Sequence, residues 1–228
     1  MSRPLAVVTG ASRGIGAAAA GRLHAAGWDV VRLARSLADH DADGIHDRCC
    51  DVTDAAAVGR VAAALGPLGV PDVLVNNAGH FLMRPFEEIS PAEFAAEVAL
   101  NLTAAFTVAH AFLPAMKQAG RGTLVTIGSV ADHVGFPGNA AYGASKFGLR
   151  GMHESLAAEC RGTGVRCTLV SPGPTDTAIW DDVRPGARGG LPSREEMMSP
   201  EDVAEAVVFA ATRPAGVRVE WIRMEPMR

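Results

Sequence analysis

The feature that most limits what this chain can fold into is the alternation of short apolar runs with longer helix-like stretches from one end to the other. The apolar runs are rich in valine, isoleucine and leucine, which is typical of strands buried on both faces, as in parallel sheets. We expect strands at 5–10, 28–35, 44–50, 71–79, 122–129, 165–173 and 218–224. We expect helices at 14–27, 54–66, 90–120, 140–162 and 199–212.

Strands and helices in this order predict a doubly wound α/β fold of the Rossmann type. The predicted sheet has seven parallel strands in the order 3-2-1-4-5-6-7, with helices on both faces. The chain has 228 residues and no repeat or low-complexity tract, so we expect a single domain over 1–228. Ligands of such folds bind beyond the carboxyl ends of the strands. Six segments that follow strands should therefore meet at one cleft: TGASRGIG, LARS, CDV, NNAG, GSVADHVG and SPGPTDT.

The bulk composition excludes several classes of protein. The formal charge of -4 is spread along the chain, which argues against a nucleic-acid surface. The four cysteines lack metal-site and disulfide-framework spacing, so we expect no metal and a reducing compartment, the cytoplasm. The N-terminus reaches a turn glycine too early for a secretory signal, and the apolar runs look too short to span a membrane.

A glycine-rich segment joins the first predicted strand to the first helix. Gly10 permits a tight turn, Gly14 lets the backbone approach a ligand, and Gly16 allows the helix to pack closely on the strand. Free N–H groups and the positive end of the helix dipole suit a pyrophosphate at this point. The segment lacks the Gly-Lys-Ser/Thr of an ATP-binding loop, so a dinucleotide is the better ligand.

The end of the second strand bears on which dinucleotide binds. A site specific for NAD places an acidic residue there to hold the ribose 2′-hydroxyl. This chain has Ala34 followed by Arg35, and Arg13 lies within the glycine segment. Two guanidinium groups can grip a 2′-phosphate, so we predict NADP(H) rather than NAD(H). The alternative is that both arginines are solvated surface residues.

Two further strand ends carry polar groups. Asp51 can accept a hydrogen bond from an adenine amino group while Val52 packs on the ring, or Asp51 can simply begin a turn. In NNAG (76–79), the asparagines can brace the sheet, line a nicotinamide ribose, or do both.

Tyr142 is the only tyrosine in the chain, and Lys146 is one of only two lysines. Residues four apart on a helix share a face, so these two side chains project together. A phenol ordinarily titrates near pH ~10, and a nearby ammonium lowers that pKa. We therefore predict that Tyr142 is a general acid and base assisted by Lys146.

Two more residues are candidates for the same centre. Ser129 ends the fifth predicted strand and can donate a hydrogen bond to a substrate oxygen. Asn101 lies inside a long helix, where asparagine can loosen the backbone locally and hold a water molecule.

Together these motifs resemble the short-chain dehydrogenase/reductase superfamily, in its branch of compact subunits. The resemblance covers almost the whole chain, through Thr9-Gly10-x-x-x-Gly14-Ile15-Gly16, Asp51-Val52, Asn76-Asn77-Ala78-Gly79, Asn101, Ser129, Tyr142-x-x-x-Lys146 and Pro172-Gly173. It implies a catalytic tetrad of Asn101, Ser129, Tyr142 and Lys146, in which Asn101 holds a water molecule of a proton relay and Lys146 also binds ribose. It implies cofactor contacts from Gly10, Ser12, Arg13, Gly14, Ile15, Gly16, Arg35, Asp51, Val52, Asn77, Ala78, Gly79, Tyr142, Lys146, Pro172, Gly173 and Thr175. It also implies a homodimer or homotetramer built on the helices 90–120 and 140–162.

The predicted function is therefore an NADP(H)-dependent oxidoreductase, most simply a ketone or aldehyde reductase acting on a small carbonyl or alcohol. The alternatives are a non-catalytic NADP(H)-binding regulator and a reductase of C=N or C=C bonds. Asp132 and His133 stand where many relatives have small residues, and His133 either caps a loop, the preferred interpretation, or faces the substrate. His80 can line the pocket, and 174–198 forms a short lid. The C-terminus lacks the glycine-rich ending of many relatives.

Overall fold

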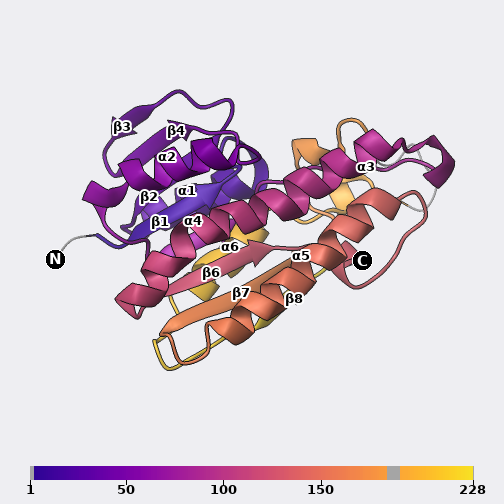
Figure 1. The fold of residues 1–228 in the computed structure, drawn as a ribbon. Helices are drawn as coiled ribbons and strands as arrows, with labels where there is room; N and C mark the ends of the chain where they lie inside the picture. Colours follow the sequence, from indigo (N-terminus) through magenta and orange to yellow (C-terminus); the bar gives the residue numbers. More distant parts are fainter. Residues whose placement is uncertain (1–2, 184–190, 228) are drawn as a thin grey trace.

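The sheet at the centre of the protein has helices on both of its faces (Figure 1). The structure is a computed structural model and describes residues 3–183 and 191–227. Within these residues the sheet has eight strands in the order β3-β4-β2-β1-β5-β6-β7-β8. The strands are β1 (Leu5–Thr9), β2 (Asp29–Ala34), β3 (His40–Ala42), β4 (Ile45–Cys49), β5 (Val73–Asn76), β6 (Gly122–Ile127), β7 (Val165–Pro172) and β8 (Trp221–Met224).

The seven predicted strands are all present, and their predicted order is confirmed. These seven strands pair with one another in parallel, as in the register that places Val7 of β1 beside Val31 of β2 and Leu74 of β5. All of β1 is buried, which matches its unbroken apolar sequence.

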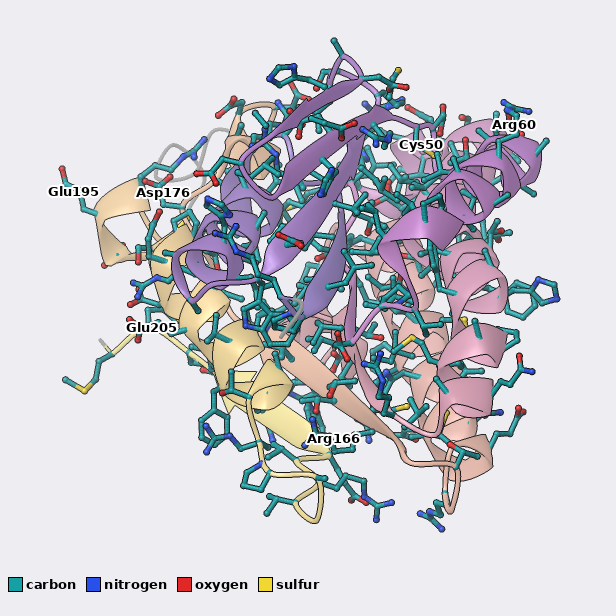
Figure 2. All side chains as sticks on the ribbon, turned by 90° about the vertical axis from the view of Figure 1, so that its left-hand side faces the viewer. Cys50, Arg60, Arg166, Asp176, Glu195 and Glu205 are labelled. Atoms are coloured by element: carbon teal, nitrogen blue, oxygen red, sulfur yellow. The ribbon has the colours of Figure 1, made fainter. Side chains whose placement is uncertain are left out.

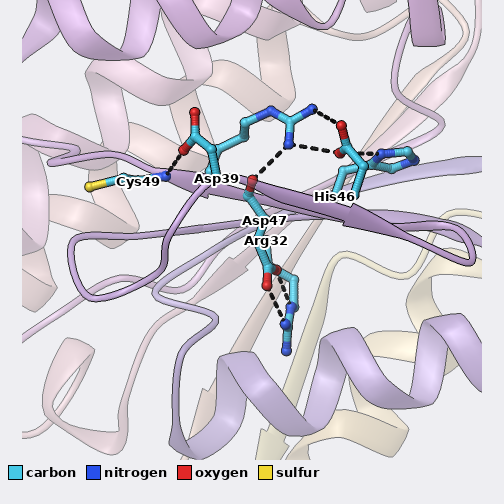
Figure 3. Close-up of polar contacts among 7 residues, drawn as sticks. Arg32, Asp39, His46, Asp47 and Cys49 are labelled. Atoms are coloured by element: carbon cyan, nitrogen blue, oxygen red, sulfur yellow. Dashed lines mark hydrogen bonds and ion pairs between the residues drawn. The ribbon is translucent and has the colours of Figure 1, made fainter.

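The prediction of seven strands is wrong by one, because β3 adds an antiparallel edge strand beside β4. Asp43 and Gly44 form its two-residue hairpin turn, with φ of 43° and 76°, the positive values that such turns require. Asp41 of β3 binds the imidazole of His46 and the guanidinium of Arg48 on β4 (Figure 3). β3 is polar and exposed, so it lacks the apolar pattern by which the other strands were predicted.

The helices form the two outer layers. α1 (Gly14–Ala25) and α6 (Pro200–Ala211) cover one face, and α2 (Ala55–Ala64), α4 (Ala104–Ala119) and α5 (Ala140–Glu159) cover the other. Figure 2 shows this arrangement, with Arg60 of α2 and Glu205 of α6 on opposite sides of the sheet. Alternate residues of each strand enter the two cores, so that Val8 packs towards α1 and α6 while Val7 packs towards α4.

The helix predicted at 90–120 is continuous but not uniform. It consists of α3 (Pro91–Val98), a π-helical turn (Ala99–Thr103) and α4, and it lies beside α5 in Figure 1. The expected N-terminal capping box forms between Ser90 and Glu93. The π turn is centred on Asn101, which confirms that the backbone is loosened at this residue. Five short 3₁₀ turns complete the described chain: Gly66–Leu68, Phe86–Glu88, Val130–Asp132, Ala178–Trp180 and Arg194–Glu196.

The same helix corrects one expectation from the sequence. By length and composition alone, Pro91–Ala119 is long and apolar enough to cross a membrane, so the statement that every apolar run is too short is wrong. Helices in protein cores pass the same test, and Val108, Phe112 and Met116 of this helix are buried against the sheet. Packing within the fold therefore accounts for part of its apolar composition, since 33% of the apolar window is buried.

Candidate active site

A cavity of about 770 Å³ lies at the carboxyl ends of the parallel strands. All six segments predicted to meet there contribute to its lining. The predicted residues that line it are Gly10, Ser12, Arg13, Gly14, Ile15, Arg35, Asp51, Val52, Asn77, Ala78, Gly79, Ser129, Tyr142, Lys146, Pro172, Gly173 and Thr175. The other two predicted site residues, Gly16 and Asn101, lie just behind the lining.

The glycine turn has the backbone conformation that was expected of it. Gly10 and Gly14 have φ of 64° and 57°, where only glycine is unstrained. A Cβ atom at Gly10 would lie 2.9 Å from the Cα of Ala78, and one at Gly16 would clash with the Asn77 amide and the Gly10 carbonyl. Among the described residues no side chain caps the N-terminus of α1, so the first N–H groups of this helix are free of a side-chain cap where Gly14 and Ile15 line the cavity.

Asn77 and Thr9 hold the NNAG segment against this turn. The Asn77 amide donates to the Thr9 carbonyl at 2.9 Å, and the Thr9 hydroxyl accepts from the backbone N–H groups of Asn77 and Ala78. Asn76 points away from the cavity and donates to the Ala105 carbonyl. One asparagine therefore braces the glycine turn and the other braces α4.

Arg13 and Arg35 line one end of the cavity. In the part of the chain that the structure describes, neither guanidinium forms an ion pair with a carboxylate. Asp51, which lies nearby, accepts from the backbone N–H and the hydroxyl of Thr53, and these hydrogen bonds lower the pKa of its carboxyl. Asp51 therefore begins a turn and also lines the cavity, and its hydrogen bond with an adenine amino group remains a prediction.

Tyr142, Ser129 and Lys146 come together at the other end. Ser129 follows β6, while Tyr142 and Lys146 lie on the first turns of α5. The Ser129 hydroxyl is hydrogen-bonded to the Tyr142 phenol, and the Lys146 Nζ lies 5.6 Å from the centre of the phenol ring. Nζ donates to the Ile127 carbonyl at 3.0 Å, which fixes the ammonium beside the end of β6.

The predicted direction of the Tyr142 pKa is wrong for the protein as the structure has it. Burial raises the pKa of this phenol, and the hydrogen bond with Ser129 opposes the rise only in part. Burial also lowers the pKa of Lys146 to about 8, against the opposing charges of Asp132 and Glu97. The phenolic proton is therefore held firmly, and the ammonium is the group poised to lose its proton near neutral pH.

Asn101 joins three parts of the site. Its side-chain NH₂ group lies within hydrogen-bonding distance of the His80 carbonyl, a Glu97 carboxylate oxygen and the Ser145 hydroxyl, and its Oδ1 accepts from the His80 N–H at 2.8 Å. The side chain is thus fully occupied by protein groups. Asn101 positions the segment after β5 against α5, and its predicted role of holding water remains a prediction.

Asp132 lies directly behind Ser129 and is completely buried. Its carboxylate accepts from the Ser129 N–H at 3.1 Å, from the Ser171 hydroxyl at 2.6 Å and from His133 Nδ1 at 2.7 Å. The His133 ring packs edge-on against Trp221 and does not line the cavity, in agreement with the preferred interpretation that it belongs to the loop.

The sequence reasoning missed the aromatic wall of the cavity. The Phe81 ring meets Tyr142 and Trp180 edge-on, at centroid distances of 4.8 and 4.9 Å. Trp180 donates its indole N–H to the Thr175 carbonyl. Parts of the predicted lid that also line the cavity are Thr177, Ala178, Ile179, Leu191 and Pro192.

Residues 184–190 of the predicted lid lie outside the described residues. The missed residues carry no motif, and only their position next to strand ends could have indicated them. Over residues 3–183 and 191–227, no group of three or more histidine, cysteine or acidic side chains is arranged to hold a metal ion.

Known proteins resemble this chain over nearly all of its length. The model of the family described as short chain dehydrogenase matches residues 4–188. D-threitol dehydrogenase of Mycolicibacterium smegmatis is 35% identical over 93% of this chain and 87% of its own. The 3-oxoacyl-[acyl-carrier-protein] reductase FabG of Escherichia coli is 36% identical over 92% of this chain and 91% of its own.

A solved structure indicates the same family. A metagenomic short-chain oxidoreductase in complex with NADP has 34% sequence identity and a TM-score of 0.80, over 99% of this chain and 97% of its own. The sequence motifs, the sheet order and the cavity agree with these likenesses. The chain belongs to the short-chain dehydrogenase family.

Proposed function

We propose that this protein is an NADP(H)-dependent oxidoreductase that interconverts a carbonyl compound and its alcohol, with reduction as the main direction. The observation that carries this proposal is the buried Tyr142 phenol, hydrogen-bonded to Ser129 and flanked by the Lys146 ammonium, in the cavity that begins at the glycine turn.

The cavity fits a dinucleotide on the geometry of its own residues. The positive φ of Gly10 and Gly14 and the uncapped start of α1 leave backbone N–H groups for a pyrophosphate. Arg13 and Arg35, without carboxylate partners in the described chain, suit a 2′-phosphate. Asp51 and Val52 would border the adenine, and Pro172, Gly173 and Thr175 would border the nicotinamide.

When bound there, the cofactor supplies the hydride. The chain's own groups then act on the substrate oxygen. Tyr142 donates its proton to that oxygen, and the Ser129 hydroxyl donates a hydrogen bond that stabilises the charge developing on it. Lys146 would hold a ribose hydroxyl of the bound cofactor, and its charge stabilises the phenolate that Tyr142 leaves behind. Asn101 keeps the π turn and the segment after β5 in register with these groups.

The Tyr142→Phe variant tests the reaction. NADPH oxidation is followed with a panel containing diacetyl, ethyl acetoacetate, glyceraldehyde, an imine and an enone. Loss of the proton donor should lower kcat by roughly a hundredfold or more, while NADPH binding, measured by fluorescence, stays intact. Unchanged turnover would refute the mechanism, and a wild type inactive on the whole panel would favour a binding protein.

The Arg35→Asp variant tests the cofactor. Loss of a charged hydrogen bond to phosphate should weaken NADPH binding by roughly tenfold to a hundredfold, with little effect on NADH. Arg161→Asp, in the exposed turn just after α5, is the matched charge control. Equal losses for both cofactors would remove the argument for a 2′-phosphate. The NADP complex of the metagenomic relative supports the preference.

We further propose a homo-oligomer that forms through α4 and α5, because Phe106 and Phe147 are exposed on these helices. Light scattering of the wild type and of Phe106→Ser tests it, and a wild-type monomer would contradict it. A cytoplasmic location is proposed as well, on the grounds that all four cysteines are free. The described part of 174–198 is proposed to cover the substrate.

A further inference from the structure

A buried carboxylate lies beside the candidate active site, on an otherwise apolar stretch of helix. Glu97 of α3 is only 2% exposed. Its Oε1 accepts from the Leu82 N–H at 3.0 Å and lies 3.1 Å from the Asn101 amide nitrogen, and its Oε2 pairs with His80 Nδ1 at 2.7 Å. A carboxylate that is buried this deeply requires close hydrogen-bond partners, because an unpaired buried charge is strongly unfavourable.

His80 connects this carboxylate to the cavity. Its side chain is 52% exposed and belongs to the cavity lining, directly after Gly79. Since Nδ1 faces Glu97, the other ring nitrogen, Nε2, is left for solvent, and it has no protein partner among the described residues. One side of the imidazole therefore meets a buried acid while the other meets water.

The pair also adjoins the catalytic candidates. Asn101 contacts both members, through the Glu97 carboxylate and through the backbone of His80. A Cβ atom at Gly79 would lie 2.8 Å from Asn101 Oδ1 and 3.9 Å from Lys146 Nζ, so little more than this glycine separates them. Burial dominates the pKa of Tyr142 and of Lys146, and the charge of Glu97 acts on both groups as a smaller effect that favours their protonated forms.

We propose that His80 and Glu97 form the solvent end of the path that returns a proton to Tyr142 after each reduction. This inference rests on the proposed function. Lys146 first gives its proton to the phenolate. A proton from bulk water then binds His80 Nε2, the Nδ1 proton passes to Glu97 Oε2, and Glu97 passes it through water to the neutral Lys146 amine. Each turnover thus takes up one proton, and no other group is oxidised or reduced.

The charges around His80 suit this role. Glu97 and Asp182 favour the imidazolium, whereas Arg13 and partial burial oppose it, and the pKa of His80 is raised overall, with the Glu97 hydrogen bond as the main cause. The other carboxylate–histidine pair near the catalytic candidates, Asp132 with His133, is closed off from the cavity: His133 is only 12% exposed and does not line the cavity. Of these two pairs, the Glu97 pair is the one whose imidazole lines the cavity and is exposed.

The test uses His80→Gln and Glu97→Gln in the full-length protein, with NADPH and the most active carbonyl of the panel. In dilute buffer at pH 8, His80→Gln should lower kcat roughly tenfold, and added imidazole should restore it by carrying protons to the vacated position. In the wild type, kcat should fall as the pH rises through the raised pKa of His80, and this inflection should vanish in the variant. His40→Gln, on the edge strand β3, is the histidine control and should behave as wild type.

The outcomes separate this inference from the proposed function. If Tyr142→Phe is inactive but His80→Gln matches the wild type at every pH and does not respond to imidazole, the proton path is refuted and the reductase assignment stands. A purely structural role would produce a loss that imidazole does not repair, and this also overturns the inference. NMR titration of the His80 ring gives a readout without substrate: its pKa should fall in Glu97→Gln, and an unchanged value would refute the pairing.

Discussion

A buried histidine under the active-site helix should make the stability of this protein depend steeply on pH. His153 of α5 is 2% exposed, and its Nδ1 lies 2.9 Å from the Thr126 hydroxyl of β6. Burial lowers the pKa of His153 from 6.5 to about 4, and the charges of Glu154 and Asp132 offset this only in part. The folded protein thus keeps this ring neutral at pH values where the unfolded chain protonates it.

The sign and size of the change in stability follow from the difference between the pKa of His153 in the folded protein and in the unfolded chain. Above pH 6.5 both states carry the neutral ring, and stability is unaffected. As the pH falls from 6.5 towards about 4, the unfolded chain binds the proton first, so the free energy of unfolding decreases. One pKa unit corresponds to about 1.4 kcal/mol, so the loss between pH 7 and pH 4.5 should reach about 2–3 kcal/mol.

Urea unfolding at pH 7 and at pH 4.5, for the wild type and for His153→Gln, measures this quantity. Glutamine retains a group that can bond Thr126 but does not titrate, so the variant should lose about 2–3 kcal/mol less than the wild type on acidification. His110→Gln, on the exposed side of α4, should leave the acid sensitivity in place. The reasoning is refuted if the wild type and His153→Gln lose the same stability between the two pH values.

Three further results are expected. Reductase kcat/KM should fall as the pH rises through about 8, where the buried Lys146 loses its ammonium charge, and a pH profile flat to pH 10 would contradict this. Asp132→Asn should lower the free energy of unfolding by about 2–4 kcal/mol in a denaturation assay, because the buried carboxylate accepts three hydrogen bonds. The exposed control Asp43→Asn should change it by less than about 0.5 kcal/mol in the same assay. Gly16→Ala should lower the free energy of unfolding by about 1–3 kcal/mol and weaken NADPH binding, because the added methyl group would clash with the Asn77 amide and the Gly10 carbonyl. NADPH binding at wild-type strength would contradict this and show that the turn can relax.

Patterns of a few neighbouring residues were enough to predict the strands and helix ends that carry a clear apolar or capping sequence. The unbroken apolar sequence of β1 and the Ser90–Glu93 capping box both specify their structure within a few residues, and both are present. The π turn at Asn101 could be expected for the same reason, since asparagine fits poorly in an ordinary helix. β3 was missed because its three residues are exposed and form no apolar pattern, so that its only signal was the Asp43-Gly44 dipeptide.

The sequence by itself determined the order of strands, the glycine turn and the pairing of Tyr142 with Lys146, because each depends on spacing along the chain. Tertiary structure decided how these groups are surrounded. The burial that raises the Tyr142 pKa, the Glu97 carboxylate behind His80 and the contact of Phe81 with Trp180 join residues from separate elements. Solvation and electrostatic energy depend on distances between such elements, and those distances exist only once the sheet has brought its strand ends together.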